Sequence, residues 1–176
     1  MEWDCFEKAT HEDLDEIMML IQKRIDWMDD NNIHQWNTTN YFECYPSSYF
    51  ENLAAKGQLY VVKEKNLNRV IGAVALLKQD KRWNDNVPSY YIHNLVSDAG
   101  FSGIGARIIE CCEELALKDG KERLRLDCQS SNEKLQAYYN DLGFKCVGRV
   151  EEGNYRGIKM EKRNRGRMDS VLRLLL

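Results

Sequence analysis

The chain has 176 residues and a mass of 20.6 kDa, which suits one domain with a substantial core but not two. Apolar residues make up 43% and charged residues 30%, a composition typical of a globular protein, and no apolar run approaches a membrane-spanning length. The formal net charge is −3, and no basic groove interleaved with aromatic residues is evident. We therefore expect neither a membrane nor a nucleic acid as partner.

The start of the chain and its cysteines indicate a reducing compartment. The chain begins with Met1-Glu2-Trp3-Asp4 and lacks the basic segment and following apolar stretch of a secretory signal. We therefore expect no secretory signal and a cytoplasmic protein. The six cysteines have neither metal-ligand spacing nor a dense disulfide pattern, and there are only three histidines. We therefore expect reduced thiols and no metal site.

Charge is unevenly distributed along the chain. Residues 1–60 carry 12 acidic and 4 basic side chains, and residues 61–176 carry 16 acidic and 21 basic ones. Such asymmetry suits a protein that binds a polyanion with one half and a cation with the other. It is also common in proteins without that function, so both interpretations stay open.

Apolar periodicity and capping residues predict eleven elements. The predicted strands cover residues 3–9, 59–65, 70–78, 88–96, 123–128, 144–150 and 155–160. The predicted helices cover residues 10–28, 47–56, 103–118 and 130–142. Thr10 is the expected N-cap of the first helix, Ser130 with Glu133 forms a capping-box pattern at the last, and residues 31–46 are expected to form a loop. The order β-α-α-β-β-β-α-β-α-β-β predicts a mixed α/β (α+β) fold with a mostly antiparallel sheet flanked by helices.

A glycine-rich turn, Gly100–Ala106, lies between a predicted strand and a predicted helix. Glycines let a backbone approach a ligand closely, and the first turn of a helix offers unpaired N–H groups to an anion. The turn therefore predicts a pyrophosphate cradle, although a glycine turn before a helix is often only structural. A nucleotide-hydrolase phosphate loop would need Lys-Ser/Thr where Ala106-Arg107 stand, and a dinucleotide fold would need a preceding parallel sheet.

A second motif lies about thirty residues downstream, where Asn132 is followed by Tyr139, Gly143 and Phe144. With the glycine turn, it resembles the GNAT superfamily of N-acetyltransferases, whose cofactor loop is Gln/Arg-x-x-Gly-x-Gly/Ala and whose later helix reads Asn, then Leu-Tyr-x-x-x-Gly-Phe. The resemblance covers most of residues 1–162, which we expect to form a single GNAT-like N-acetyltransferase domain. It departs at Gly100, which replaces the Gln/Arg of the loop and so removes a side chain near the phosphates. Residues 163–176 form a basic, leucine-rich tail whose role is open.

The resemblance implies acetyl-CoA as cosubstrate. The strand at 93–96 would splay from the strand at 123–128, and the pantetheine arm would bond to backbone groups at Leu95 and Val96. Asn132 would contact the arm from the opposite side. The pyrophosphate would be bound by the backbone amides of Ser102, Gly103, Ile104, Gly105 and Ala106.

The same resemblance implies a direct attack of a neutral amine on the thioester. Tyr139 would protonate the departing thiolate, its alternative role being core packing. His93 would accept a proton from the ammonium substrate, because an imidazole can do so near neutral pH. A structural role for His93 and a water chain as base remain alternatives.

The aromatic residues Trp36, Tyr41 and Tyr45 lie where the family's variable acceptor loop would be. They suit the alkyl part or the charge of an amine, and they could equally seal the loop against the core. The expected acceptor is a primary amine of a small molecule or peptide. The alternative function is an acyl-CoA sensor without turnover, supported by Gly100 and by the lack of a carboxylate base. A homodimer is common in the family.

Overall fold

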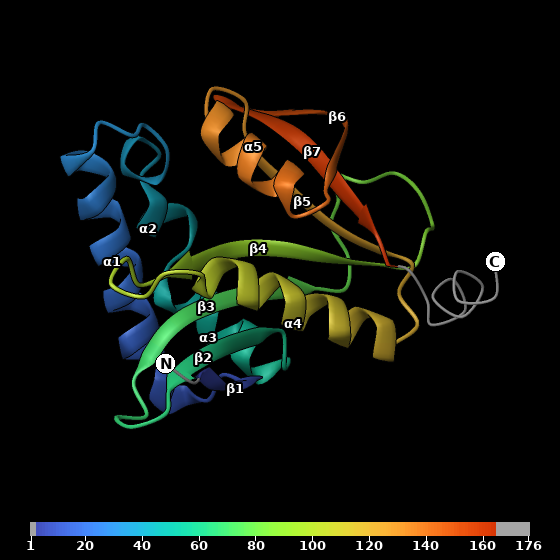
Figure 1. The fold of residues 1–176 in the computed structure, drawn as a ribbon. Coiled ribbons are helices and arrows are strands. Elements are labelled where there is room, and N and C mark those ends of the chain that lie inside the picture. Colours follow the sequence, from blue (N-terminus) through green and yellow to red (C-terminus); the bar gives the residue numbers. More distant parts are fainter. Residues whose placement is uncertain (1–2, 165–176) are drawn as a thin grey trace. The chain divides into compact units, whose positions relative to one another are not determined.

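The structure is a computed structural model that describes residues 3–164 (Figure 1). These residues form two compact units. The first comprises residues 3–76 and 93–109, and the second comprises residues 77–92 and 110–164. The fourth strand and the fourth helix each contribute to both units.

The first unit contains four strands in the order β1-β2-β3-β4. β1 pairs antiparallel with β2 (Phe6 opposite Val62), and β2 pairs antiparallel with β3 (Val61 opposite Ala73). The elements are β1 (Trp3–Lys8), η1 (His11–Asp13), α1 (Leu14–Asp30), η2 (Trp36–Thr38), α2 (Tyr41–Cys44), α3 (Ser47–Ala55), β2 (Leu59–Glu64), β3 (Val70–Leu77), the end of β4 (Ser89–Ser97) and the start of α4 (Ile104–Lys118).

The second unit contains four strand segments in the order β4-β5-β7-β6. β4 pairs parallel with β5, whereas the β5–β7 and β6–β7 pairs are antiparallel. Besides the start of β4 and the end of α4, the elements are β5 (Arg123–Gln129), α5 (Glu133–Asp141), β6 (Lys145–Glu152) and β7 (Tyr155–Arg163). The predicted fold class, a mixed and mostly antiparallel sheet flanked by helices, is confirmed.

Polar contacts fix α1 to the strands of the first unit. The Asp13 carboxylate accepts hydrogen bonds from the backbone and hydroxyl of Thr10, the predicted cap, and lies 2.8 Å from Nζ of Lys63 on β2. The Glu16 carboxylate accepts from the amide of Val70 at the start of β3 (2.6 Å). Further along the helix, the Arg24 guanidinium donates to the carbonyl of Ser97. α1 is therefore held at β2, β3 and the end of β4.

The start of α4 packs directly on β3 at Gly72. A Cβ atom placed on Gly72 would lie 2.7 Å from Cδ1 of Ile108 and 2.8 Å from Cγ2 of Ile104. The neighbouring residues Ile71 and Ala73 project to the other face of the strand and are also buried. β3 is therefore covered on both faces, and the absence of a side chain at Gly72 sets how closely α4 approaches it.

Two local predictions are wrong. Residues 31–46 are not a simple loop, because they contain η2 and α2, whose aromatic rings pack against one another. The N-cap of α5 is Asn132, whose Oδ1 accepts from the amide of Leu135 (3.0 Å), rather than Ser130. In the described part of the chain, no helix is both long enough and apolar enough to cross a bilayer. Most of the predicted tail, residues 165–176, lies outside the described residues.

Because Gly72 leaves no room for a side chain, we expect Gly72→Val to lower the free energy of unfolding by about 2 kcal/mol, the usual cost of overpacking a core. Gly72→Ala should cost less. Denaturant unfolding measures both. Arg149→Val, at an exposed position of β6, is the control and should change stability little. Equal stability of Gly72→Val and the parent chain would contradict the close packing.

Candidate active site

The glycine-rich turn leads into the first turn of α4, all within the first unit. The turn is shaped by Asp98, whose carboxylate accepts from the amide of Gly100 (2.8 Å) and whose carbonyl accepts from the amide of Phe101 (3.1 Å). Gly103 has φ +85°, a left-handed conformation that favours glycine, and nothing lies within 4 Å of a Cβ placed there. The space beside this residue is therefore open.

The amides at the start of α4 are available to an anion. The amide of Arg107 bonds to the carbonyl of Gly103 (3.0 Å), so the amides of Ile104, Gly105 and Ala106 precede that helical bond. Gly105 and Ala106 are half-buried, and Ser102 and Gly103 are exposed. The five residues predicted to bind pyrophosphate thus form one continuous segment, with the positive end of the helix dipole behind it.

Two arginines of the first unit lie beside this turn. Besides its bond to the Ser97 carbonyl, Arg24 places Nη2 3.3 Å from the Ser97 hydroxyl. The guanidinium of Arg69 lies over the ring of Phe101, with Cζ 5.4 Å from the ring centroid. The Nε atom of Arg69 is buried without a hydrogen-bond partner among the described residues. Two guanidinium groups therefore stand near the turn although Gly100 carries no side chain, and Glu64, 3.8 Å from Arg69, and Asp98, beside Arg24, offset part of their charge.

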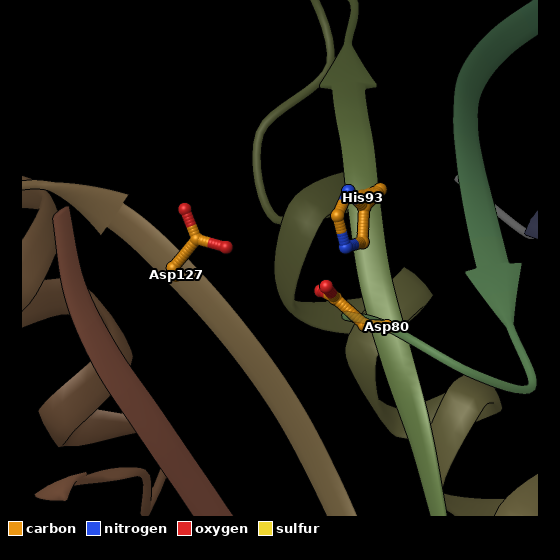
Figure 2. Close-up of side chains that lie close together, drawn as sticks. All are labelled: Asp80, His93 and Asp127. Carbon is orange, nitrogen blue, oxygen red and sulfur yellow. The ribbon is translucent and has the colours of Figure 1, made fainter. Parts of the chain in front are cut away.

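The predicted residues of β4, His93, Leu95 and Val96, lie in the second half of the strand. His93 projects from β4 (Figure 2) and is half-buried, as is Leu95, whereas Val96 is buried. Between them, Asn94 has φ +50°, in the left-handed region, inside a strand. A left-handed residue interrupts the regular pleat, so the backbone groups of Asn94 and Leu95 are turned out of the ordinary ladder geometry.

The predicted acceptor residues form an aromatic layer with Tyr49, made of Trp36, Tyr41, Tyr45 and Tyr49. Ring centroids are 4.6 Å apart for Trp36–Tyr41, 4.9 Å for Tyr41–Tyr45 and 5.1 Å for Tyr45–Tyr49. Tyr41 is buried, and the other three are half-buried. Burial raises the pKa of Tyr41 far above its ordinary value, and the hydrogen bond from Asn94 offsets only part of this. Tyr41 therefore supports the layer from beneath while its neighbours face outward.

Of the other predicted residues, both in the second unit, Asn132 immediately precedes α5 and Tyr139 lies on it. The Asn132 side chain caps the helix, a role that the sequence motif did not reveal. The ring of Tyr139 is buried beside Tyr138 and Phe144. Burial raises the pKa of Tyr139 well above its ordinary value, and the nearby Cys128 thiol raises it further. The Tyr139 hydroxyl therefore keeps its proton well above neutral pH.

The second unit also contains a group of charged residues that sequence reasoning missed. Asp80 follows β3 and Asp127 lies on β5, with an oxygen of each within 4.8 Å of the other (Figure 2). The Asp127 carboxylate accepts from Arg82 (3.0 Å) and from the Tyr155 hydroxyl (2.5 Å). Its two oxygens are therefore engaged by protein donors. The alternation of charged residues in the strand at 123–128 was the sequence signal that could have revealed this charged group.

Arg125 is a second unexpected feature of β5. Its side chain is 3% exposed and pairs with Asp85 (2.8 Å) and Glu161 (2.8 Å). Leu124, the residue before it, is buried as the alternating pattern predicted. The opposite face of β5 is thus also buried, and it holds a compensated charge instead of apolar side chains.

The buried tyrosines predict how the chain titrates at high pH. Burial raises the pKa of Tyr41, Tyr139 and Tyr155, so each keeps its proton in the folded chain where an unfolded tyrosine, with a pKa of about 10, has lost it. Their contribution to stability is complete below about pH 10 and declines as the pH rises above it. Ultraviolet titration should therefore ionise at most six of the nine tyrosines before the chain unfolds. In denaturant all nine should titrate together, and the same result in native buffer would contradict the burial.

Comparison with known proteins agrees with the fold. Residues 20–144 match the Acetyltransferase (GNAT) family. An uncharacterized N-acetyltransferase of Bacillus subtilis (strain 168), YesJ, is 25% identical over 154 residues, which cover 82% of this chain and 83% of the relative.

Solved structures share the architecture. A GNAT-family acetyltransferase from Listeria monocytogenes 4b F2365 has a TM-score of 0.74 at 20% identity, covering 93% of this chain and 98% of that one. The PaiA N-acetyltransferase from Thermoplasma acidophilum, in complex with coenzyme A, has a TM-score of 0.71 at 18% identity, covering 93% and 99%. Since the family match spans most of the chain and includes both predicted motifs, this chain belongs to the GNAT family of acetyltransferases.

Proposed function

We propose that this chain transfers the acetyl group of acetyl-CoA to a primary amine of a small molecule or peptide, in a ternary complex. The observation that carries the proposal is the accessible start of α4 in a chain of the acetyltransferase family, where the amides of residues 104–106 precede the Gly103–Arg107 hydrogen bond. The name of YesJ, an N-acetyltransferase, supports nitrogen as the acceptor atom. A cytoplasmic location and a homodimer stay predictions.

The glycine-rich turn suits a pyrophosphate in shape and charge. The open space at Gly103 permits close approach of an anion, and the helix dipole favours it. The guanidinium groups of Arg24 and Arg69 supply positive charge that the residue at position 100 does not. The replacement of Gln/Arg by Gly100 therefore weakens the predicted binding less than the motif alone suggests.

The proposed chemistry needs a polarised carbonyl, a base and an acid. The amine nitrogen attacks the thioester carbon, and an N–H of β4 near Leu95 or Val96 polarises the carbonyl oxygen. The C–S bond then breaks, and its electrons leave as a thiolate. Before the attack, His93 or water takes the proton that the ammonium group must lose. Tyr139 donates a proton to the thiolate, and the second proton of the acylated nitrogen returns to the tyrosinate as the amide forms. Burial keeps the Tyr139 phenol protonated at neutral pH, as a proton donor must be, although its raised pKa makes it a weaker acid than a tyrosine in water.

For Tyr139→Phe we expect kcat to fall by roughly ten- to a thousandfold, the range for loss of a general acid, with coenzyme A binding nearly unchanged. Thiol release measures the rate, and calorimetry with coenzyme A measures binding. Tyr138→Phe, on the same helix but 37% exposed, is the matched control and should retain its rate.

Two outcomes would contradict this proposal. A wild-type chain that gives no heat and no thermal stabilisation at millimolar coenzyme A has no cofactor site. A chain that binds acetyl-CoA but releases no thiol with any amine is an acyl-CoA sensor, the alternative that the residue at position 100 favours.

For His93→Ala we expect the rate to drop near pH 7 and to recover as the pH rises, because more of the amine is then uncharged and no base is needed. The pH profile of kcat/KM measures this. His11→Ala, at an exposed position of η1, provides the control. A His93→Ala profile that overlays the wild-type one would remove His93 as the base and leave water.

A further inference from the structure

Asn94 differs from the other asparagines with a left-handed backbone. Four described residues other than glycine have positive φ, and three of them, Asn32, Asn40 and Asn68, stand outside the strands. Asn94 stands inside β4, between His93 and Leu95. Asparagine tolerates this conformation better than most residues, yet a strand offers no local reason for it.

The side chain of Asn94 connects β4 to the aromatic layer. Its Nδ2 donates to the Tyr41 hydroxyl (2.6 Å), and its Oδ1 accepts from the Tyr49 hydroxyl (3.1 Å). Tyr41 lies on α2 and Tyr49 lies on α3, so the side-chain amide of Asn94 holds both helices to β4. All of these residues belong to the first unit.

The aromatic layer offers a surface to a small apolar body. Trp36, Tyr45 and Tyr49 are half-buried. Trp36 stacks on the buried ring of Tyr41, Tyr45 lies tilted against that ring, and Tyr49 contacts Tyr45 edge to face. Neither an acidic nor a basic side chain belongs to the layer itself. The surface therefore suits the hydrocarbon or ring of an amine, whose nitrogen could reach past Asn94 toward Leu95.

We propose that Asn94 is a positioning residue for the acceptor amine. Its amide sets the aromatic layer at a fixed distance from Leu95, so that an amine with an apolar body presents its nitrogen where the thioester carbonyl is polarised. The left-handed backbone of Asn94 contributes to this positioning, because it directs the side chain toward Tyr41 and Tyr49. This inference rests on the proposed acetyl transfer to an amine.

Asn94→Gly tests the proposal, since glycine keeps the left-handed backbone and removes both hydrogen bonds. With tryptamine, hexylamine and spermidine as acceptors, we expect KM for the amines with apolar bodies to rise about tenfold, the effect of losing about one net hydrogen bond. KM for acetyl-CoA and the affinity for coenzyme A should stay within about twofold of wild type. A purely structural role would not separate these two KM values.

Three further variants complete the experiment. Asn68→Gly makes the same change at a left-handed asparagine in the turn before β3 and should leave both KM values as they are. Asn94→Asp keeps two oxygens that can accept from both tyrosine hydroxyls and should restore most of the amine KM. Tyr49→Phe removes one of the two bonds without touching β4 and should raise the amine KM in the same direction, which keeps the test valid if Asn94→Gly folds poorly.

The outcomes separate the inference from the proposed function. If the wild type acetylates an amine and Asn94→Gly matches it, or raises KM for acetyl-CoA equally, Asn94 does not position the acceptor. Preference for spermidine over both apolar amines would overturn the apolar substrate class. A wild type that binds coenzyme A but acetylates none of the three amines overturns the acceptor assignment and this inference with it, while leaving the cofactor site intact.

Discussion

The close packing of α4 on β3 is the constraint on which the rest of the first unit depends. Because Gly72 has no side chain, Ile104 and Ile108 contact the strand backbone directly and fix the position of the first helical turn. The turn before that helix is then held by Asp98, whose own amide bonds to the carbonyl of Ile71 (2.8 Å), the residue beside Gly72. The orientation of the amides that would face a pyrophosphate is thus set by core packing on β3 and not by the turn alone.

Much of the fold and the segments of the candidate site could be predicted from the sequence, because their helices, strands and turns have strong local signals. The Gly100–Ala106 turn and the segment from Asn132 to Phe144 combine glycines, caps and apolar spacing whose meaning does not depend on distant residues. The helices at 36–38 and 41–44 were missed because they depend on packing of the rings of Trp36, Tyr41 and Tyr45, and such packing is a feature of tertiary structure. The shift of the α5 cap from Ser130 to Asn132 has a similar origin, since both residue types are good caps and only the backbone path decides between them.

The polar core of the second unit was not predictable by pattern for a different reason. An arginine in an alternating strand normally faces solvent, yet Arg125 is buried because Asp85 and Glu161, far away in sequence, supply its counter-charges. Arg82, Asp127 and Tyr155 repeat the arrangement on a neighbouring part of β5. Such pairs stabilise a fold little in comparison with apolar packing, but they make the unit intolerant of losing one partner, since the remaining charge would be buried alone.

Burial of Tyr139 affects proton transfer to the thiolate through the pKa of both groups, not through the pKa of Tyr139 alone. A phenol whose pKa lies far above neutrality is a weak acid toward a thiolate in water, where thiols have a pKa of about 8.5. Burial, with the nearby Asp127, raises the pKa of the Cys128 thiol, which neighbours Tyr139 in the second unit, to about 12. A thiolate leaving beside Tyr139 would be destabilised in the same way, so its basicity would rise together with that of the tyrosinate. Proton transfer depends on the difference between the pKa of the tyrosine and that of the thiol. Because burial raises both pKa values, it changes their difference less than either value alone, and Tyr139 stays protonated until the C–S bond breaks.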